Sequence, residues 1–307
     1  MSAFIFGAGY SGRAIAGALL RATDRVWGTT RSTDNMQRLD DLGVSPLLFD
    51  GTPIKPGRDK SLNTALRQTT HLIVSIAPDN AGDPVLRALN GGRLRDYMPA
   101  LRWIGYLSTV GVYGNHDGAW VDETTPCRPG QQRSMQRLDA ERKWDAEASR
   151  DGIPLSIIRL SGIYGPGRNA LKTALDGKAR RIIKPDQVFN RIHVDDIGGA
   201  VALLASVRKH GIVNVTDDEP APPQDVVDYA CELTGVIPPV EIPFEWAELT
   251  PMARTFYGEN KRVANARLRS LGYDLRYPDY RTALSAMWAD GSWQDDEGDA
   301  LPKRRAG

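Results

Sequence analysis

The stretch Gly7-Ala8-Gly9-Tyr10-Ser11-Gly12 lies between an apolar, strand-like run (Ala3–Phe6) and a helix-like run. It is a G-x-G-x-x-G pattern in the strand-then-helix context that a phosphate-binding loop requires. Gly7 permits the tight turn, Gly9 lets the backbone approach a pyrophosphate, and Gly12 lets helix and strand pack closely. The helix N-terminus adds free N–H groups and the positive end of the helix dipole. We therefore expect a dinucleotide site here that includes Tyr10 and Ser11; a glycine-rich turn without a ligand is the alternative.

Length and composition are those of an ordinary α/β protein. The chain has 307 residues, of which 41% are hydrophobic and 25% charged, and its formal net charge is +1. Nothing in this balance points to nucleic acid or an anionic membrane. Two cysteines and four histidines argue against a disulfide framework and a zinc site. No apolar run approaches the roughly 20 residues of a membrane span, and no signal-peptide pattern opens the chain. We expect a cytoplasmic protein, a monomer or homodimer, without a metal.

Short apolar runs alternate with longer amphipathic stretches, which predicts βαβ units. The predicted strands read as continuous Val/Ile/Leu runs, as strands buried on both faces do. They are Ala3–Phe6, Arg25–Thr29, Ser45–Phe49, His71–Ile76, Trp103–Leu107, Ser156–Leu160 and Ile212–Val215. Helices are expected near 11–21, 33–42, 61–68, 84–98, 135–150 and 195–208, and further on near 223–234, 261–271 and 278–289. The fold class is a Rossmann doubly wound parallel sheet with a smaller, mostly helical C-terminal lobe.

The domain boundaries follow from where this alternation stops. Residues 1–165 form the expected dinucleotide-binding domain, completed by about 191–216. Residues 166–190 and 217–290, with several prolines in the connections, form the expected substrate lobe. Residues 291–307 are charged and are expected to be a flexible tail. Ligands on such sheets bind beyond the carboxyl ends of the strands.

The end of the second strand indicates which cofactor is used. An acidic residue there would bind the ribose 2′-hydroxyl of NAD, whereas an arginine suits the 2′-phosphate of NADP. The chain has Arg31 between Thr30 and Ser32 and no acid at this point. NADP is therefore the expected cofactor, with NAD possible and a solvated surface arginine as the alternative. Asp50 is expected beside the adenine or, equally, in a turn, and Ala77 is assigned to the cofactor site.

An ordered set of motifs resembles the extended short-chain dehydrogenase/reductase family, and more closely its atypical, NAD-dependent epimerase/dehydratase-like branch. The motifs are GAGYSG at 7–12, LSTVGVYG at 107–114, DETTP at 122–126, Arg159 with YGPG at 164–167, RIHVDDI at 191–197 and VNVTDDEP at 213–220. The resemblance covers nearly the whole chain. It implies a Rossmann domain and a substrate lobe, with the last sheet strand returning after residue 191.

The chain departs from this family at the residues that carry proton transfer. In the family a tyrosine and a lysine four residues later form the catalytic pair, and a serine or threonine orients the substrate oxygen. Ser108 and Thr109 match the latter, but alignment places Arg133 and Arg137 at the pair positions. An arginine keeps its proton and cannot act as a general acid near neutral pH. The first glycine of the family's usual G-x-x-G-x-x-G is also replaced, by Phe6.

Each nominated catalytic residue has a structural alternative. Arg133, Arg137 and Glu141 recur every four residues, so they form either an exposed ion-pair ladder or a cationic face toward cofactor and substrate. Ser108 and Thr109 either bond a substrate carbonyl or satisfy local backbone. Tyr113 and Tyr164 are the nominated replacement acids, although loop tyrosines more often pack.

Three further residues are assigned to a substrate anion: Arg168, Arg191 and His193. The first two belong to a basic stretch, 168–191, which either binds a phosphate or carboxylate or is simply solvated. His193 precedes Asp195, which is expected to be a helix N-cap, so a buried structural histidine is the alternative.

Two classes of function remain open. The first is an NAD(P)-dependent oxidoreductase or epimerase-like enzyme that acts on a small substrate, which can be anionic. The second is a non-catalytic NADP(H)-binding sensor or scaffold that has lost the catalytic pair. A nucleic-acid-binding role would have only the basic stretch behind it.

Overall fold

The computed structural model describes residues 1–23, 25–55 and 58–294. The expected tail therefore lies mostly outside the described residues. Contacts divide the chain into two compact units. Of the described residues, unit 1 comprises those in 1–112, 132–159 and 197–213, and unit 2 comprises those in 113–131, 160–196 and 214–294. Four segments that were expected in the first domain group with unit 2: 113–131, 160–165, 191–196 and 214–216.

A seven-stranded sheet forms the centre of the dinucleotide-binding fold, as predicted. Its strand order is β11-β7-β5-β4-β1-β2-β3. From β1 the chain adds strands first on one side and then, from β4 on, on the other side, as in doubly wound sheets. The strands are β1 (Ala3–Phe6), β2 (Val26–Thr30), β3 (Ser45–Leu48), β4 (His71–Val74), β5 (Trp103–Thr109), β7 (Leu155–Leu160) and β11 (Gly211–Val215). β1, β2, β3, β4 and β5 pair in parallel, with Ala3 opposite Val26 and His71.

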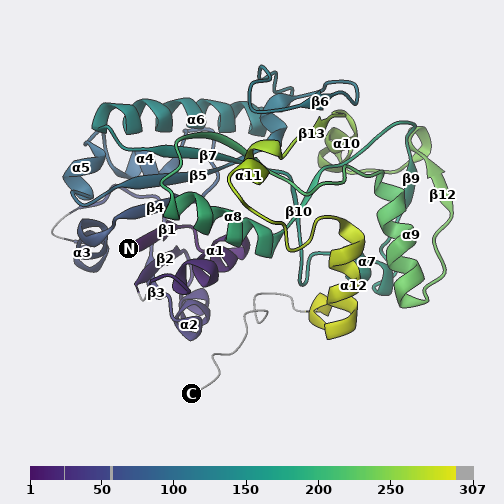
Figure 1. Ribbon diagram of the computed structural model, residues 1–307, viewed down its shortest axis with the longest axis horizontal. Coiled ribbons are helices and arrows are strands. Elements are labelled where there is room, and N and C mark those ends of the chain that lie inside the picture. The colour runs from purple at the N-terminus through teal and green to yellow at the C-terminus, as the bar shows by residue number, and fades with distance from the viewer. Residues whose placement is uncertain (24, 56–57, 295–307) are drawn as a thin grey trace. The chain divides into compact units, whose positions relative to one another are not determined.

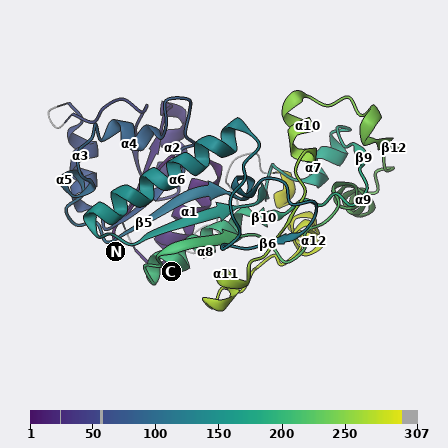
Figure 2. The same ribbon diagram turned by 90° about the horizontal axis from the view of Figure 1, so that it is seen from above.

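Helices cover both faces of the sheet in unit 1 (Figure 1). On one face lie α3 (Lys60–Gln68), α4 (Pro84–Ala88), α5 (Leu94–Tyr97) and α6 (Gln132–Asp151). They bury a core that includes Phe4, Phe6, Tyr106 and Trp144. On the other face lie α1 (Tyr10–Leu20), α2 (Thr33–Asp41) and α8 (Val194–Ser206). Figure 2 shows the long helix α6 running along the strands from above.

Unit 2 is built from short elements. Its strands form parallel pairs: β10 (Arg191–His193) with β8 (Gly162–Tyr164), β12 (Glu241–Pro243) with β9 (Arg181–Ile183), and β13 (Arg262–Val263) with β6 (Trp120–Val121). Its helices are α7 (Ala170–Leu175), α9 (Pro223–Thr234), α10 (Pro251–Tyr257), α11 (Ala266–Ser270) and α12 (Tyr280–Asp290), with the short turns η1 (Val110–Tyr113), η2 (Phe244–Trp246) and η3 (Ser292–Gln294). The α7, α9 and α12 helices share a core around Leu171, Ala230 and Tyr280.

Three sequence predictions about elements differ from the structure. The helix expected at 84–98 is divided into α4 and α5, because Asn90 and Gly91 both take positive φ. The helix expected at 261–271 is shorter, since its first residues form β13. Asp195 is not the N-cap of α8, because that helix already begins at Val194 and Asp195 lies in its first turn. Within the described residues, no helix is both long and apolar enough to cross a membrane.

Candidate dinucleotide-binding site

The three loop glycines are required for three different steric reasons. Gly7 has φ +87°, and a Cβ there would lie 2.8 Å from Cγ1 of Ile76. A Cβ on Gly12 would lie 2.6 Å from the carbonyl oxygen of Gly7, so the loop and the helix touch at this point. A Cβ on Gly9 would meet nothing within 4 Å. Gly9 therefore borders open space, which is where a pyrophosphate would approach the backbone.

The N-terminus of α1 has backbone donors available for an anion. Gly9 is the N-cap residue and has no side chain that could accept from the helix N–H groups. Tyr10 and Ser11 are the first residues of the helix, and its first turn contains no acidic residue. The N–H of Arg13 donates to the Gly9 carbonyl at 2.8 Å, which closes the first helical turn. The N–H groups ahead of it have no partner within an α-helix. The residues present thus fit the phosphates of a dinucleotide.

The second strand holds this loop in place through Thr29, which the sequence analysis did not single out. The Gly7 N–H donates to Oγ1 of Thr29 at 2.9 Å, and the Ala8 N–H donates to the Thr29 carbonyl at 2.8 Å. A Cβ on Gly28 would lie 2.9 Å from Cβ of Ala8. A glycine inside a strand is the available sequence signal for such a close approach.

The other predicted cofactor residues lie at the carboxyl ends of neighbouring strands. Arg31 directly follows β2 and is exposed, and Ala77, beyond β4, is exposed as well. Asp50 follows β3, and its Oδ1 accepts from the Thr52 N–H at 2.9 Å. This bond favours the turn interpretation of Asp50 and lowers the pKa of its carboxyl.

Ser108, at the end of β5, is occupied by a buried network. Its side chain is 5% exposed, and its hydroxyl donates to Oε1 of Glu141 on α6. Glu141 is itself 3% exposed and forms a salt bridge of 2.8 Å with Arg159 on β7. The alternative of an exposed ladder is therefore wrong for Glu141, because its partner is a buried arginine on the sheet.

Thr109 and Arg137 lie closer to solvent at the same strand end. Oγ1 of Thr109 accepts from the Gly111 N–H at 3.1 Å. Arg137 donates to the Leu107 carbonyl at 2.7 Å and lies 5.6 Å from the ring centre of Tyr106. The guanidinium of Arg137 is thereby fixed at the carboxyl edge of the sheet, whereas Arg133, one turn earlier, is exposed.

The two nominated tyrosines belong to unit 2 and are both enclosed. Tyr113 is fully buried, and its hydroxyl donates to Oδ1 of Asn214 at 2.7 Å. Burial and the carboxyl of Asp217 raise the pKa of Tyr164. The enclosed positions of the two phenols, with the Tyr113 hydroxyl committed to Asn214, give no support to a role as proton donors.

The predicted anion-binding residues are spread over unit 2. His193 is 1% exposed, packs 4.1 Å from the ring centre of Tyr277, and its Nδ1 accepts from the Asp195 N–H. Burial lowers its pKa to about 3. Arg191 donates to the carbonyls of Phe189 and Ala221 at 2.9 and 3.1 Å. These contacts favour structural roles for His193 and Arg191.

Arg168 has a different setting, in an open hollow of about 500 Å³ within unit 2. Lys172 and Lys178 also line the hollow. Both lysines are within 3.4 Å of Asp176, which offsets part of their charge.

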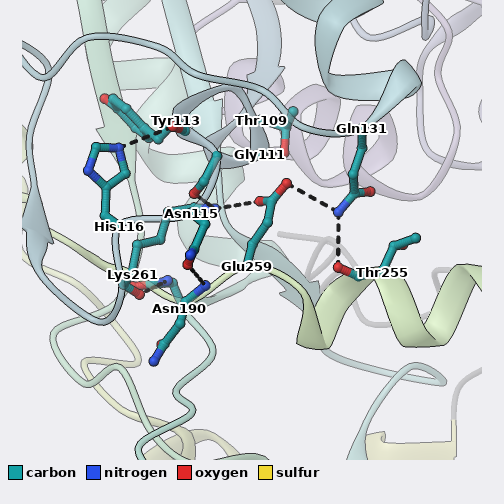
Figure 3. Close-up of polar contacts among 12 residues, drawn as sticks. Thr109, Gly111, Tyr113, Asn115, His116, Gln131, Asn190, Thr255, Glu259 and Lys261 are labelled. Carbon is teal, nitrogen blue, oxygen red and sulfur yellow. Dashed lines mark hydrogen bonds and ion pairs between the residues drawn. The ribbon is translucent and has the colours of Figure 1, made fainter.

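A polar network in unit 2 was not anticipated from the sequence (Figure 3). Lys261 is 6% exposed and donates to the Gly114 carbonyl and to Oε2 of Glu259, both at 2.7 Å. Gln131 donates to the other oxygen of Glu259 and to the Thr255 carbonyl. The network ties the segment 113–131 to the segment 255–261, two stretches far apart in the sequence.

Several known proteins are similar to this chain over nearly its whole length. A functionally unknown conserved protein from Silicibacter pomeroyi is 46% identical, with a TM-score of 0.84 over 94% of this chain and 99% of that one. A putative NAD-dependent epimerase/dehydratase from Methylobacillus flagellatus is 27% identical, with a TM-score of 0.73 over 94% and 98%. Protein YeeZ of Escherichia coli K12 is 26% identical over 90% of this chain and 96% of its own. No family model matches the chain.

The class of protein follows from the sheet order and the glycine loop: this is a Rossmann-fold protein with a glycine-rich loop of the dinucleotide-binding type. More distant solved epimerases and dehydratases in complex with NAD, at 15–21% identity, share its fold. These similarities support the resemblance to the extended short-chain dehydrogenase/reductase family, whose epimerase/dehydratase fold the chain shares.

Proposed function

We propose that this protein is an NADP(H)-dependent oxidoreductase that acts on a small, anionic substrate without the family's tyrosine–lysine pair. The observation that carries the proposal is the loop 7–12, where Gly9 leaves open space in front of uncapped helix N–H groups. When bound, the cofactor supplies or accepts a hydride. The residues of the chain bind it and orient the substrate.

Each of these tasks has a candidate in unit 1. The first-turn N–H groups of α1 hold the pyrophosphate, and Arg31 pairs with the 2′-phosphate. Thr109, rather than the buried Ser108, orients the substrate oxygen, since the Ser108 hydroxyl is committed to Glu141. Arg137, anchored on the Leu107 carbonyl, provides a fixed positive charge beside it. Arg133 and Arg137 keep their protons, so the proton comes from the substrate or from water.

A second candidate function is a non-catalytic NADP(H)-binding sensor. It is favoured by the buried network of Ser108, Glu141 and Arg159, because the Ser108 hydroxyl bonds to Glu141 and is not available to a substrate. The two functions share the cofactor and differ in turnover. A panel of small carboxylated aldehydes and ketones, with consumption of NADPH followed by absorbance, separates them.

The cofactor proposal is tested by titrating the protein with NADPH and with NADH, followed by nucleotide fluorescence. A charged bond to the 2′-phosphate is worth about 1.5–3 kcal/mol, so we expect NADPH to bind roughly ten- to a hundred-fold more tightly. Arg31→Ala should remove most of this preference. Arg67→Ala, an exposed arginine on α3, is the matched control and should retain it. Equal affinities in the unmodified protein, or no binding of either nucleotide, would contradict the proposal.

A further inference from the structure

Arg13, the residue after the last loop glycine, is a buried cation. Its side chain is only 8% exposed although it lies in the first turns of α1. Its Nε is covered and has no hydrogen-bond partner among the described residues. A buried guanidinium donor without an acceptor costs free energy, and arginines are rarely this buried unless they are paired. An acceptor atom supplied by a ligand would account for a buried arginine at this position.

The position of Arg13 on α1 directs it away from the sheet and from α8. The α8 helix lies against Ala14, because a Cβ on Gly198 would lie 2.6 Å from the Ala14 carbonyl oxygen. Leu20 is seven residues after Arg13, or about two helical turns, and therefore lies on the same side of α1. Its Cδ1 lies 3.9 Å from the position that a Cβ on Gly43, just beyond α2, would take. Arg13 is therefore on the side of α1 that faces α2, the helix that begins shortly after Arg31.

Charges around Arg13 leave this place electropositive. Arg38 on α2 is close enough to lower the pKa of Arg13, after desolvation, and Tyr10 acts in the opposite direction. None of the described carboxylates is among the groups that act on it. A buried arginine on α1 with the charge of Arg38 on α2 acting on it, and Arg31 at the nearby strand end, suits a phosphate dianion.

We propose that Arg13 is a specificity-determining residue that binds the 2′-phosphate of NADP(H), together with Arg31, in the space between α1 and α2. The inference rests on the proposed dinucleotide site and adds a buried residue to its specificity. A buried cation discriminates more strongly than an exposed one, because water competes less for it. Arg13 should therefore contribute more to the NADP preference than the exposed Arg31.

The experiment compares two small probes that differ only in the 2′-phosphate: adenosine 2′,5′-bisphosphate and 5′-AMP. Calorimetric titration of the unmodified protein should show at least about ten-fold tighter binding of the bisphosphate. Arg13→Met should remove most of this difference and leave the 5′-AMP affinity unchanged. Arg13→Lys should keep part of it, and Arg21→Met, an exposed arginine at the end of the same helix, should keep all of it. Arg13→Gln is the second neutral variant if Arg13→Met does not fold.

Three results would overturn the inference while leaving the dinucleotide site in place. These are no preference for the bisphosphate in the unmodified protein, an unchanged preference in the neutral variants, and an equal loss of both probes. The last result would show that Arg13 serves the 5′-phosphate or the fold. If the unmodified protein binds neither probe and neither NADH nor NADPH, the proposed function itself fails.

Discussion

Two regions at the carboxyl edge of the same sheet differ in how their polar groups are satisfied. In the loop 7–12 polar groups remain open: Gly9 borders empty space, and the helix N–H groups carry no side-chain cap. At the end of β5 the polar groups are closed: Ser108 and Arg159 both bond to Glu141 in the interior. A binding site and a structural network can therefore be built from similar polar residues. Whether a residue serves one or the other depends on its hydrogen-bond partner and on its exposure to solvent.

The largest expected effect comes from breaking the closed region. Glu141→Ala leaves Arg159 as a buried charge without its partner, so the free energy of unfolding should fall by about 3–5 kcal/mol. Urea unfolding measures this change. Asp139→Ala, on the same helix, removes an exposed ion pair of 2.7 Å with Lys143 and should change stability by less than about 1 kcal/mol. Equal effects of the two variants would show that the buried pair has no special role.

A smaller effect is expected where the open loop meets the helix. Gly12→Ala places a methyl group 2.6 Å from the Gly7 carbonyl oxygen, which must move. Overpacking of this kind costs about 1–3 kcal/mol, and the displaced loop should also bind NADPH less well. Thermal unfolding and a nucleotide titration on the same variant test both expectations. A fully stable Gly12→Ala protein that binds NADPH normally would mean that the loop relaxes freely.

A buried polar group in unit 2, the imidazole of His193, should make the stability of the protein depend on pH. Burial lowers the pKa of His193 from 6.5 to about 3 in the folded protein. The unfolded chain therefore binds the additional proton between these two pH values, and stability falls as the pH drops below about 6.5. One such histidine contributes at most about 1.4 kcal/mol per pH unit.

His193→Gln should flatten this dependence, as measured by urea unfolding at a series of pH values. Part of the dependence of stability on pH should remain, because His71 is also buried and its pKa is lowered to about 4. A slope identical to that of the unmodified protein would mean that His193 is protonated without cost in the folded state.

Much of the fold could be predicted from the sequence, because buried parallel strands and amphipathic helices leave strong patterns. The run Ala3–Phe6 and the helix at 223–234 match the structure at both ends. The short strands of unit 2 were missed, since two or three residues such as Arg262–Val263 form no periodic pattern. Their pairing depends on contacts between distant segments.

The site was predictable only where geometry follows from residue type. Glycines mark the close approaches at 7–12, so the tight geometry of this loop could be predicted from the residue types, whereas its ligand stays a prediction. The burial of Glu141 was not predictable, because its spacing from Arg137 also fits an exposed ladder, and the decisive partner, Arg159, is distant in the sequence. Arg13 was overlooked for the same reason, as helix position alone does not reveal burial.

The central claim is that the loop 7–12 holds a nicotinamide dinucleotide, and calorimetric titration of Gly9→Ala with NADPH tests it most directly. The added methyl group meets nothing within 4 Å, so the variant should unfold at the temperature of the unmodified protein. Its NADPH affinity should nevertheless fall at least about ten-fold, or 1.4 kcal/mol, because the methyl group lies where the pyrophosphate approaches. Gly130→Ala, whose methyl group is equally unobstructed, should bind NADPH as the unmodified protein does. Unchanged NADPH affinity in Gly9→Ala, or no binding by the unmodified protein, would contradict the account.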